Sequence, residues 1–282
     1  VTPWALTAFL ELLRQRRLRS SSIVALLTTV VAIFSVHQLV ILLLMYVVIL
    51  VGWFFSQGSF AMRLRGALLP VGAAGAMFVV LNAYWVVPSI TAPPTVLDEV
   101  AEAEMAFFAV QNFSSWGDAF DAATLYGFWR VSPTVERPGP GLHFGTFLPV
   151  LFLSVFAVVA SFSGSTALSR HRWIVAALLI IGLLGLGLGL GSRTALGAEF
   201  YHELWDRVPV IRGFREPHKF IGSLALAYAF LGGLGVGVLE RWRRPWLRGT
   251  VRAAARGLTA LLVIGVSVAF SFPFYTALGK QI

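Results

Sequence analysis

The polar residues best suited to chemistry lie between positions 193 and 220, between two long apolar runs. Pro217 directly precedes the second run, and proline is favoured at the first position of a helix. Cations beside the exposed N–H groups of such a helix start suit a phosphate or diphosphate. The alternative is that these residues anchor the helix among lipid headgroups. The candidate phosphate ligands are four cationic side chains: Arg212, Arg215, His218 and Lys219.

A second polar segment, residues 91–145, carries acidic and aromatic side chains. A carboxylate can act as a base on a sugar hydroxyl, cations hold a leaving phosphate, and aromatic rings bind sugar faces and prenyl chains. The aromatic residues also predict short interfacial helices, or simply a belt at the membrane surface. The candidate side chains of this segment are Asp98, Glu99, Asp118, Asp121, Trp116 and Trp129.

Several kinds of site are excluded by residue type and spacing. The chain has no cysteine, which excludes disulfides, thiolate metal sites and cysteine nucleophiles. Its five histidines are scattered and none pairs at i, i+4. Phosphate-binding Walker loops, nucleophile elbows, zincin motifs and dinucleotide fingerprints are also missing. We therefore predict no metal site and no cofactor.

The composition identifies an integral membrane protein. Hydrophobic residues make up 57% of the 282 residues, charged residues only 12%, and the mean hydropathy is +0.80. The formal charge of +9 raises the possibility of nucleic-acid binding. The arginines, however, flank apolar runs and form no basic face, so we expect a lipid bilayer and no nucleic acid as partner.

Hydropathy predicts an all-α, polytopic transmembrane helix bundle that forms one domain over residues 1–282. Residues 1–19 read as an interfacial helix, with Trp4, Phe9, Leu12 and Leu13 in lipid. The run 20–57 exceeds one span of ~20 residues and predicts two short spans that turn near His37 and Gln38. The remaining five of the seven predicted spans are residues 66–90, 146–163, 172–191, 217–239 and 257–273.

The distribution of arginine predicts the orientation. With residues 1–19 in the cytoplasm, fourteen of the 22 basic residues lie inside, including those of 14–19 and 241–256. Cytoplasmic segments of membrane proteins carry the excess of Lys and Arg. This orientation places the segments 91–145 and 192–216 together on the extracytoplasmic side of the plasma membrane.

Small and polar residues within the spans predict helix packing. One span carries five glycines between 182 and 191, and another repeats Ala225, Ala229, Gly233 and Gly237 at a spacing of four. Such stripes let helix backbones approach closely in lipid. Asn82 is expected to bond across helices, and His37 to lie in a turn or pack. Few ionisable residues fall within spans, which disfavours an ion-coupled transporter.

The order of these features resembles a known superfamily. The motifs are FSVHQLVILLLMY, LNAYWVVPSI, an outer loop that ends LYGFW, LGLGLGS, and VPVIRGFREPHKF before a helix. Together they resemble GT-C-type polytopic membrane glycosyltransferases, notably the YfhO-like and arabinofuranosyltransferase-like membrane proteins. The most specific match is to an Arg-x-Pro-x-Lys/Arg-Phe pattern, in which Arg215, Pro217, Lys219 and Phe220 hold the matching places.

The resemblance implies a protein that takes sugars from polyprenyl-phosphate carriers outside the cytoplasm. It also implies an acidic catalytic motif in a first outer loop, which no acidic residue here matches. The chain opens with Val1 and is interpreted as a fragment that holds the carrier-binding half. The alternatives are a non-catalytic assembly or lipid-handling component, or a transporter with a pathway lined by His37 and Asn82.

Overall fold

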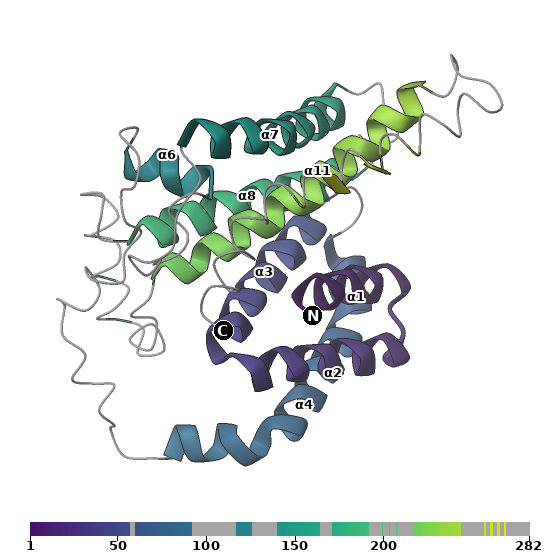
Figure 1. The fold of residues 1–282 in the computed structure, drawn as a ribbon. Coiled ribbons are helices and arrows are strands. Elements are labelled where there is room, and N and C mark those ends of the chain that lie inside the picture. Colours follow the sequence, from purple (N-terminus) through teal and green to yellow (C-terminus); the bar gives the residue numbers. More distant parts are fainter. Residues whose placement is uncertain are drawn as a thin grey trace.

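The structure is a computed structural model, which describes most of the apolar segments of the chain (Figure 1). The described residues are 1–56, 60–91, 117–125, 140–163, 171–191 and 217–243, with the isolated positions 199, 203, 207, 257, 260, 261, 264, 265 and 268. No strand occurs among them. The helices are α1 (Thr2–Gln15), α2 (Leu18–Phe34), α3 (Val36–Phe55), α4 (Phe60–Thr91), α6 (Asp118–Ala123), α7 (Pro140–Phe162), α8 (Arg172–Leu190), the 3₁₀ helix η4 (Pro217–Phe220) and α11 (Ile221–Arg243).

The described residues are all-α, as predicted, and five of these helices are long and apolar enough to cross a membrane. They are α3, α4, α7, α8 and η4 with α11. The predicted span within 20–34 is α2, which is apolar but has only 17 residues. Of the predicted span 257–273 the structure describes only the positions 257, 260, 261, 264, 265 and 268. Seven spans therefore remain a prediction.

The apolar run 20–57 folds as two helices, as predicted. The break falls at Ser35, two residues before the predicted turn, where the backbone is extended. The Ser35 hydroxyl accepts a hydrogen bond from the Gln38 backbone N–H at 3.3 Å, which caps the start of α3. A capping serine thus divides a run whose hydropathy is continuous.

Helix α1 packs against other helices through the side chains that were expected to lie in lipid. Phe9, Leu12 and Leu13 are buried, and Phe9 stacks on Tyr46 of α3 with ring centroids 4.2 Å apart. The expectation that these three side chains face lipid is therefore wrong, because the neighbouring helices cover them. Trp4 is 71% exposed, as expected.

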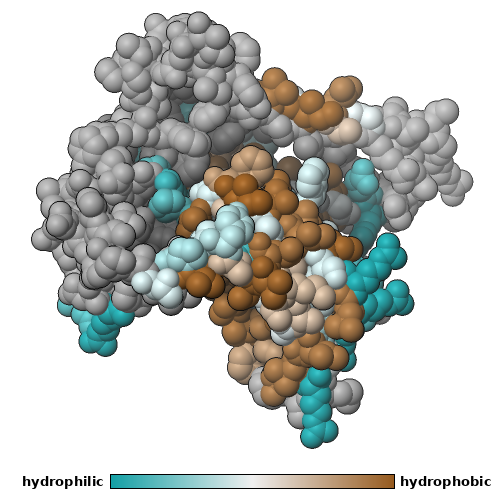
Figure 2. All heavy atoms as spheres, turned by 90° about the horizontal axis from the view of Figure 1, so that it is seen from below, coloured by the Kyte–Doolittle hydropathy of each residue, from teal (hydrophilic) through white to brown (hydrophobic). Residues whose placement is uncertain are grey.

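The helices form two packed groups that meet at α8 (Figure 1). One core joins α1–α4 with Ala177 and Ile181 of α8, and the other joins α7 and α11 with Val175 and Leu178 of α8. Viewed from below Figure 1, the side of α2 and α4, the described helices present a broad apolar surface with hydrophilic side chains at its margins (Figure 2). An apolar outer surface on α4, with Val80 75% exposed, is typical of contact with lipid.

The glycines of α8 allow close contact with α11. A Cβ atom added at Gly185 would lie 2.8 Å from the Phe220 carbonyl oxygen and 3.0 Å from the Leu224 nitrogen, which leaves no room for a side chain. A Cβ atom added at Gly182 would lie 3.3 Å from the Ala227 Cβ. Three α8 glycines, and Gly191 directly after the helix, thus lie close to η4 or α11: Gly182, Gly185, Gly189 and Gly191.

The spacing-of-four stripe on α11 does not make the contact that was predicted. Gly233 and Gly237 have open space around them, and Ala229 is exposed. Gly235 is the α11 glycine at a helix contact, since an added Cβ would lie 2.8 Å from the Leu153 carbonyl carbon of α7. Within the described residues α7 and α8 cover other faces of α11, so Gly233 and Gly237 of the stripe make no close helix contact there.

Candidate functional site

The short helix α6 lies at the end of the bundle where α8 ends and η4 begins. Ala122 of α6 packs with Leu190 of α8 and Ile221 of α11 in a small buried cluster. Gly117, at φ 98°, precedes α6, and this positive φ favours glycine. Part of the long segment 91–145 is thereby held against the apolar helices.

Two side chains from different helices bind the backbone of α6 and its end. The Tyr228 hydroxyl of α11 donates to the Ala123 carbonyl at 3.0 Å. Nε2 of His143, in the first turns of α7, lies 2.8 Å from the Thr124 carbonyl. Because a carbonyl only accepts, Nε2 carries the proton in this contact. Phe147 packs edge-on against Tyr228 with ring centroids 5.2 Å apart. These contacts fix α6 relative to α7 and α11.

The acids of α6 are the described members of the predicted acidic group. Asp121 is 1% exposed and close enough to His143 for an electrostatic interaction. Asp118 is half-buried, and its Oδ1 atom is buried with no hydrogen-bond partner among the described residues. Buried carboxylate oxygens normally accept hydrogen bonds, so Asp118 retains an unused acceptor.

The cations of η4 lie at the same end of the bundle as these acids. η4 begins at Pro217, which confirms the predicted helix start, and Pro217 is buried beside Gly191. His218 and Lys219 follow and are half-buried. Ile221, directly after η4, packs in the same buried cluster as Ala122 of α6 and Leu190 of α8, so α6 and η4 both lie at the carboxyl end of α8. The described acids of α6 and the described cations of η4 thus lie at one end of α8, while the predicted meeting of segments 91–145 and 192–216 stays a prediction.

The other predicted site residues lie outside the described part of the chain. They are Arg212, Arg215, Asp98, Glu99, Trp116 and Trp129. Among the residues that the structure does describe, no group of three His, Cys, Asp or Glu side chains could hold a metal ion. The site therefore offers carboxylates and cations as its chemical groups.

Two residues of this site, His143 and Tyr228, were missed by sequence reasoning. His143 was counted among scattered histidines, and Tyr228 lies within an apolar run. Both side chains form hydrogen bonds to backbone carbonyls, and sequence patterns do not reveal such bonds. The available signal was the pair His143 and Phe147, which are four residues apart and therefore on one face of α7.

Asn82 of α4 serves packing within the helices, as predicted. Its side-chain Nδ2 donates to Thr29 Oγ1 of α2 and to the Phe78 carbonyl, both at 2.8 Å. Trp85 Nε1 donates to Asn82 Oδ1 at 2.9 Å. Asn82 is fully buried with these three bonds, so it lines no water-filled pathway.

The chain matches no protein family, no curated protein and no solved structure.

Proposed function

We propose that this protein is part of a membrane-embedded, glycosyltransferase-like machinery of the plasma membrane. In this proposal it binds a polyprenyl-phosphate-linked sugar on the extracytoplasmic side. The observation that supports the proposal is that α6 and η4 both lie at the carboxyl end of α8, beside the buried cluster of Ala122, Leu190 and Ile221. Carboxylates and cations thus lie at one end of the apolar helices, where the polar head of a lipid carrier would lie.

Each group has a role that suits its chemistry. Lys219 and His218 would bind the carrier phosphate, since charge-assisted bonds to phosphate are short and strong. Asp118, a half-buried carboxylate of α6, would take the proton from an attacking sugar hydroxyl. Arg212 and Arg215 precede η4 in the sequence and would supply further phosphate contacts. The apolar helices beside the site would accept the prenyl chain.

The test is the affinity of the chain in nanodiscs for a short-chain polyprenyl phosphate. A charge-assisted bond contributes about 1.5–3 kcal/mol, so Lys219→Ala should weaken binding by roughly 10- to 150-fold. The matched control is Arg207→Ala, since Arg207 is an exposed cation of the segment 192–216 that pairs with Glu203. Equal affinities for the wild type and folded Lys219→Ala would leave η4 as a headgroup anchor and refute the carrier site.

A second measurement separates an enzyme from a carrier-binding component. Asp118→Asn should retain carrier affinity but reduce sugar transfer from a polyprenyl-phosphate sugar by about 10²–10⁴-fold, the usual contribution of a general base. Carrier binding without transfer in the wild type would instead favour the non-catalytic, lipid-handling role.

A further inference from the structure

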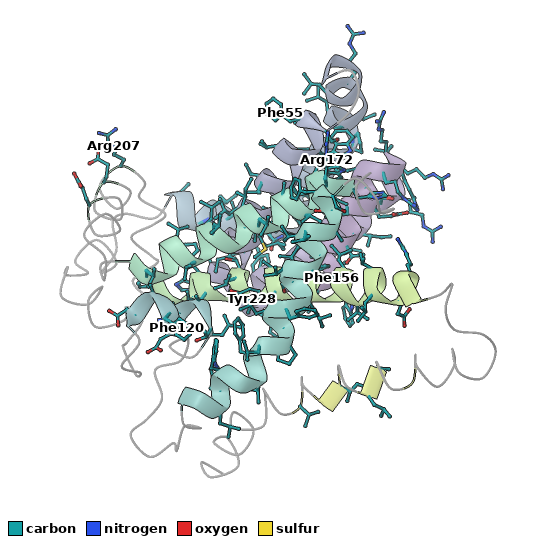
Figure 3. The ribbon with its side chains drawn as sticks, turned by 90° about the horizontal axis from the view of Figure 1, so that it is seen from above. Phe55, Phe120, Phe156, Arg172, Arg207 and Tyr228 are labelled. Atoms are coloured by element: carbon teal, nitrogen blue, oxygen red, sulfur yellow. The ribbon has the colours of Figure 1, made fainter. Side chains whose placement is uncertain are left out.

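A cavity of about 740 Å³ lies at the opposite end of α8 from the α6–η4 site. It forms where α1, α3, α7 and α8 meet, and its volume falls within the range of small-molecule sites. Arg172 of α8 and Phe55 of α3, which both line it, lie together in Figure 3, apart from Phe120 and Tyr228. The polar and aromatic lining residues are Thr7, Glu11, Arg14, Trp53, Phe55, Ser56, Phe162, His171, Arg172 and Trp173.

The helix ends around the cavity set its depth in a bilayer. α3 ends at Phe55, α7 ends at Phe162 and α8 begins at Arg172, and all three are long enough to span. The ends of spans lie among lipid headgroups, where tryptophan rings are enriched. The cavity is therefore at headgroup depth, and the 19 residues of α8 separate it from the α6–η4 site by about 28 Å.

The charges around the cavity favour an anion. Glu11 is the acid among the described lining residues, and its carboxylate binds Arg14 at 2.8 Å. Arg14 holds the pKa of Glu11 below its usual value, so this pair stays charged and largely compensates itself. Arg172 and His171 are exposed at the cavity, and Arg172 makes no ion pair within the described residues. The surplus charge at the cavity is therefore positive.

Another cation lies against the wall of the cavity. The Arg16 guanidinium lies 5.5 Å from the centre of the Trp53 ring, a distance typical of a cation–π contact. Arg16 has a left-handed backbone, at φ 55°, and this ends α1. Arg16, at the Trp53 ring, and Arg172, in the lining, thus both add positive charge near the cavity.

We propose that this cavity binds the phosphate of an anionic phospholipid headgroup, with Arg172 as the main ligand. Arginine suits phosphate because its planar group donates two parallel hydrogen bonds. Trp53 and Trp173 would pack against the glycerol region, where their rings meet both water and acyl chains. A soluble phosphate ion offers the same chemistry, so the test separates the two sources. The proposal is independent of carrier binding at the α6–η4 site.

The test uses the full chain in a neutral maltoside detergent and three probes. These are dihexanoyl-phosphatidylglycerol, dihexanoyl-phosphatidylcholine and inorganic phosphate, each titrated by calorimetry. The chain should bind phosphatidylglycerol well above phosphatidylcholine. Arg172→Gln should weaken phosphatidylglycerol binding about tenfold, and Arg172→Lys should recover part of the affinity, since it keeps the charge without the planar fork. Helix content by circular dichroism checks that each variant is folded.

Arg19→Gln is the matched control, because Arg19 is an exposed arginine of α2 that does not line the cavity. It should leave affinity unchanged, which distinguishes a site from general attraction between basic residues and anionic lipid. If inorganic phosphate displaces phosphatidylglycerol, the cavity is a phosphate site that takes a soluble ion. If inorganic phosphate does not displace it, the lipid is the supported occupant. Equal binding of the two lipids, or equal losses in Arg172→Gln and Arg19→Gln, would overturn the proposal.

Discussion

The buried polar side chains inside the described apolar helices are hydrogen-bonded. Asn82 bonds to α2, while the Tyr46 hydroxyl of α3 lies 3.1 Å from Thr28 Oγ1 and donates to the Ala5 carbonyl at 3.3 Å. In lipid no water replaces a missing hydrogen bond, so each such group needs a partner. These residues therefore join helices, which explains why they sit within apolar sequence.

Asn82→Ala should lower stability by about 1–3 kcal/mol, because Thr29 loses a donor and Trp85 Nε1 loses its acceptor. Thr91→Ala on the same helix is the control, since the exposed Thr91 hydroxyl bonds only to the Val87 carbonyl one turn earlier. Thermal unfolding in detergent measures both. A midpoint for Asn82→Ala equal to that of Thr91→Ala would show that the α2–α4 bond contributes no stability.

At the level of helices, contacts depend on which face a neighbour covers. In α8 the glycines at 182, 185 and 189 meet η4 and α11, while Gly187 has open space around it. In α11 the contact with α7 falls at Gly235, two residues from Gly233. Two residues turn a helix by about 200°, so this shift places the contact on the opposite face. The glycine content of α8 and α11 predicts that these helices approach their neighbours closely. Which glycines make the contacts follows only from the packed structure.

Gly235→Leu should destabilise the protein and Gly233→Leu should be tolerated. At Gly235 the new side chain meets the Leu153 backbone, which cannot move as a side chain can, and overpacked sites cost about 1–3 kcal/mol or more. Gly233 faces open space among the described residues, so Gly233→Leu is the matched control. It introduces the same side chain and the same change in helix propensity. The comparison is the detergent unfolding temperature of the two variants. A lower temperature for Gly233→Leu than for Gly235→Leu would contradict the packing described.

Helix boundaries set by local chemistry were predictable. Pro217 begins η4 as expected, and the break at Ser35 falls two residues from the predicted turn. The burial of Phe9 was not predictable, because an amphipathic helix can cover either lipid or protein with the same pattern. At the site, Asp118 and Asp121 were predicted from their type, whereas His143 and Tyr228 bind backbone carbonyls that no sequence motif records.

For the whole molecule, the two ends of α8 belong to different surfaces. The α6–η4 site lies at one end and the cavity around Arg172 at the other. In the predicted orientation the first end faces outward and the second faces the cytoplasm. The arginines around the cavity would then lie on the side where membrane proteins concentrate basic residues.

The native chain has no cysteine, so single cysteines can report this orientation without background labelling. In the seven-span topology, Arg19→Cys and Ser163→Cys should label from the cytoplasmic side and Arg207→Cys from the outside. In this topology α8 is the single span between positions 163 and 207, so Ser163→Cys and Arg207→Cys must label from opposite sides of the membrane. If α2 does not cross, Arg19→Cys would label from the opposite side to Ser163→Cys. Membrane-impermeant maleimide applied to sealed vesicles makes the measurement.

The unequal lengths of α2 and α4 have a consequence for the surrounding lipid. The 17 residues of α2 extend about 25 Å, and the apolar stretch Leu64–Pro88 of α4 extends about 38 Å. The two helices are joined by the bond from Ser21 Oγ to the Pro70 carbonyl, at 2.7 Å, and by Asn82. In the seven-span topology a bilayer core of ~30 Å fits neither helix upright, so we expect α4 to tilt and the lipid beside α2 to thin. Hydrophobic mismatch thus differs around the perimeter of this protein.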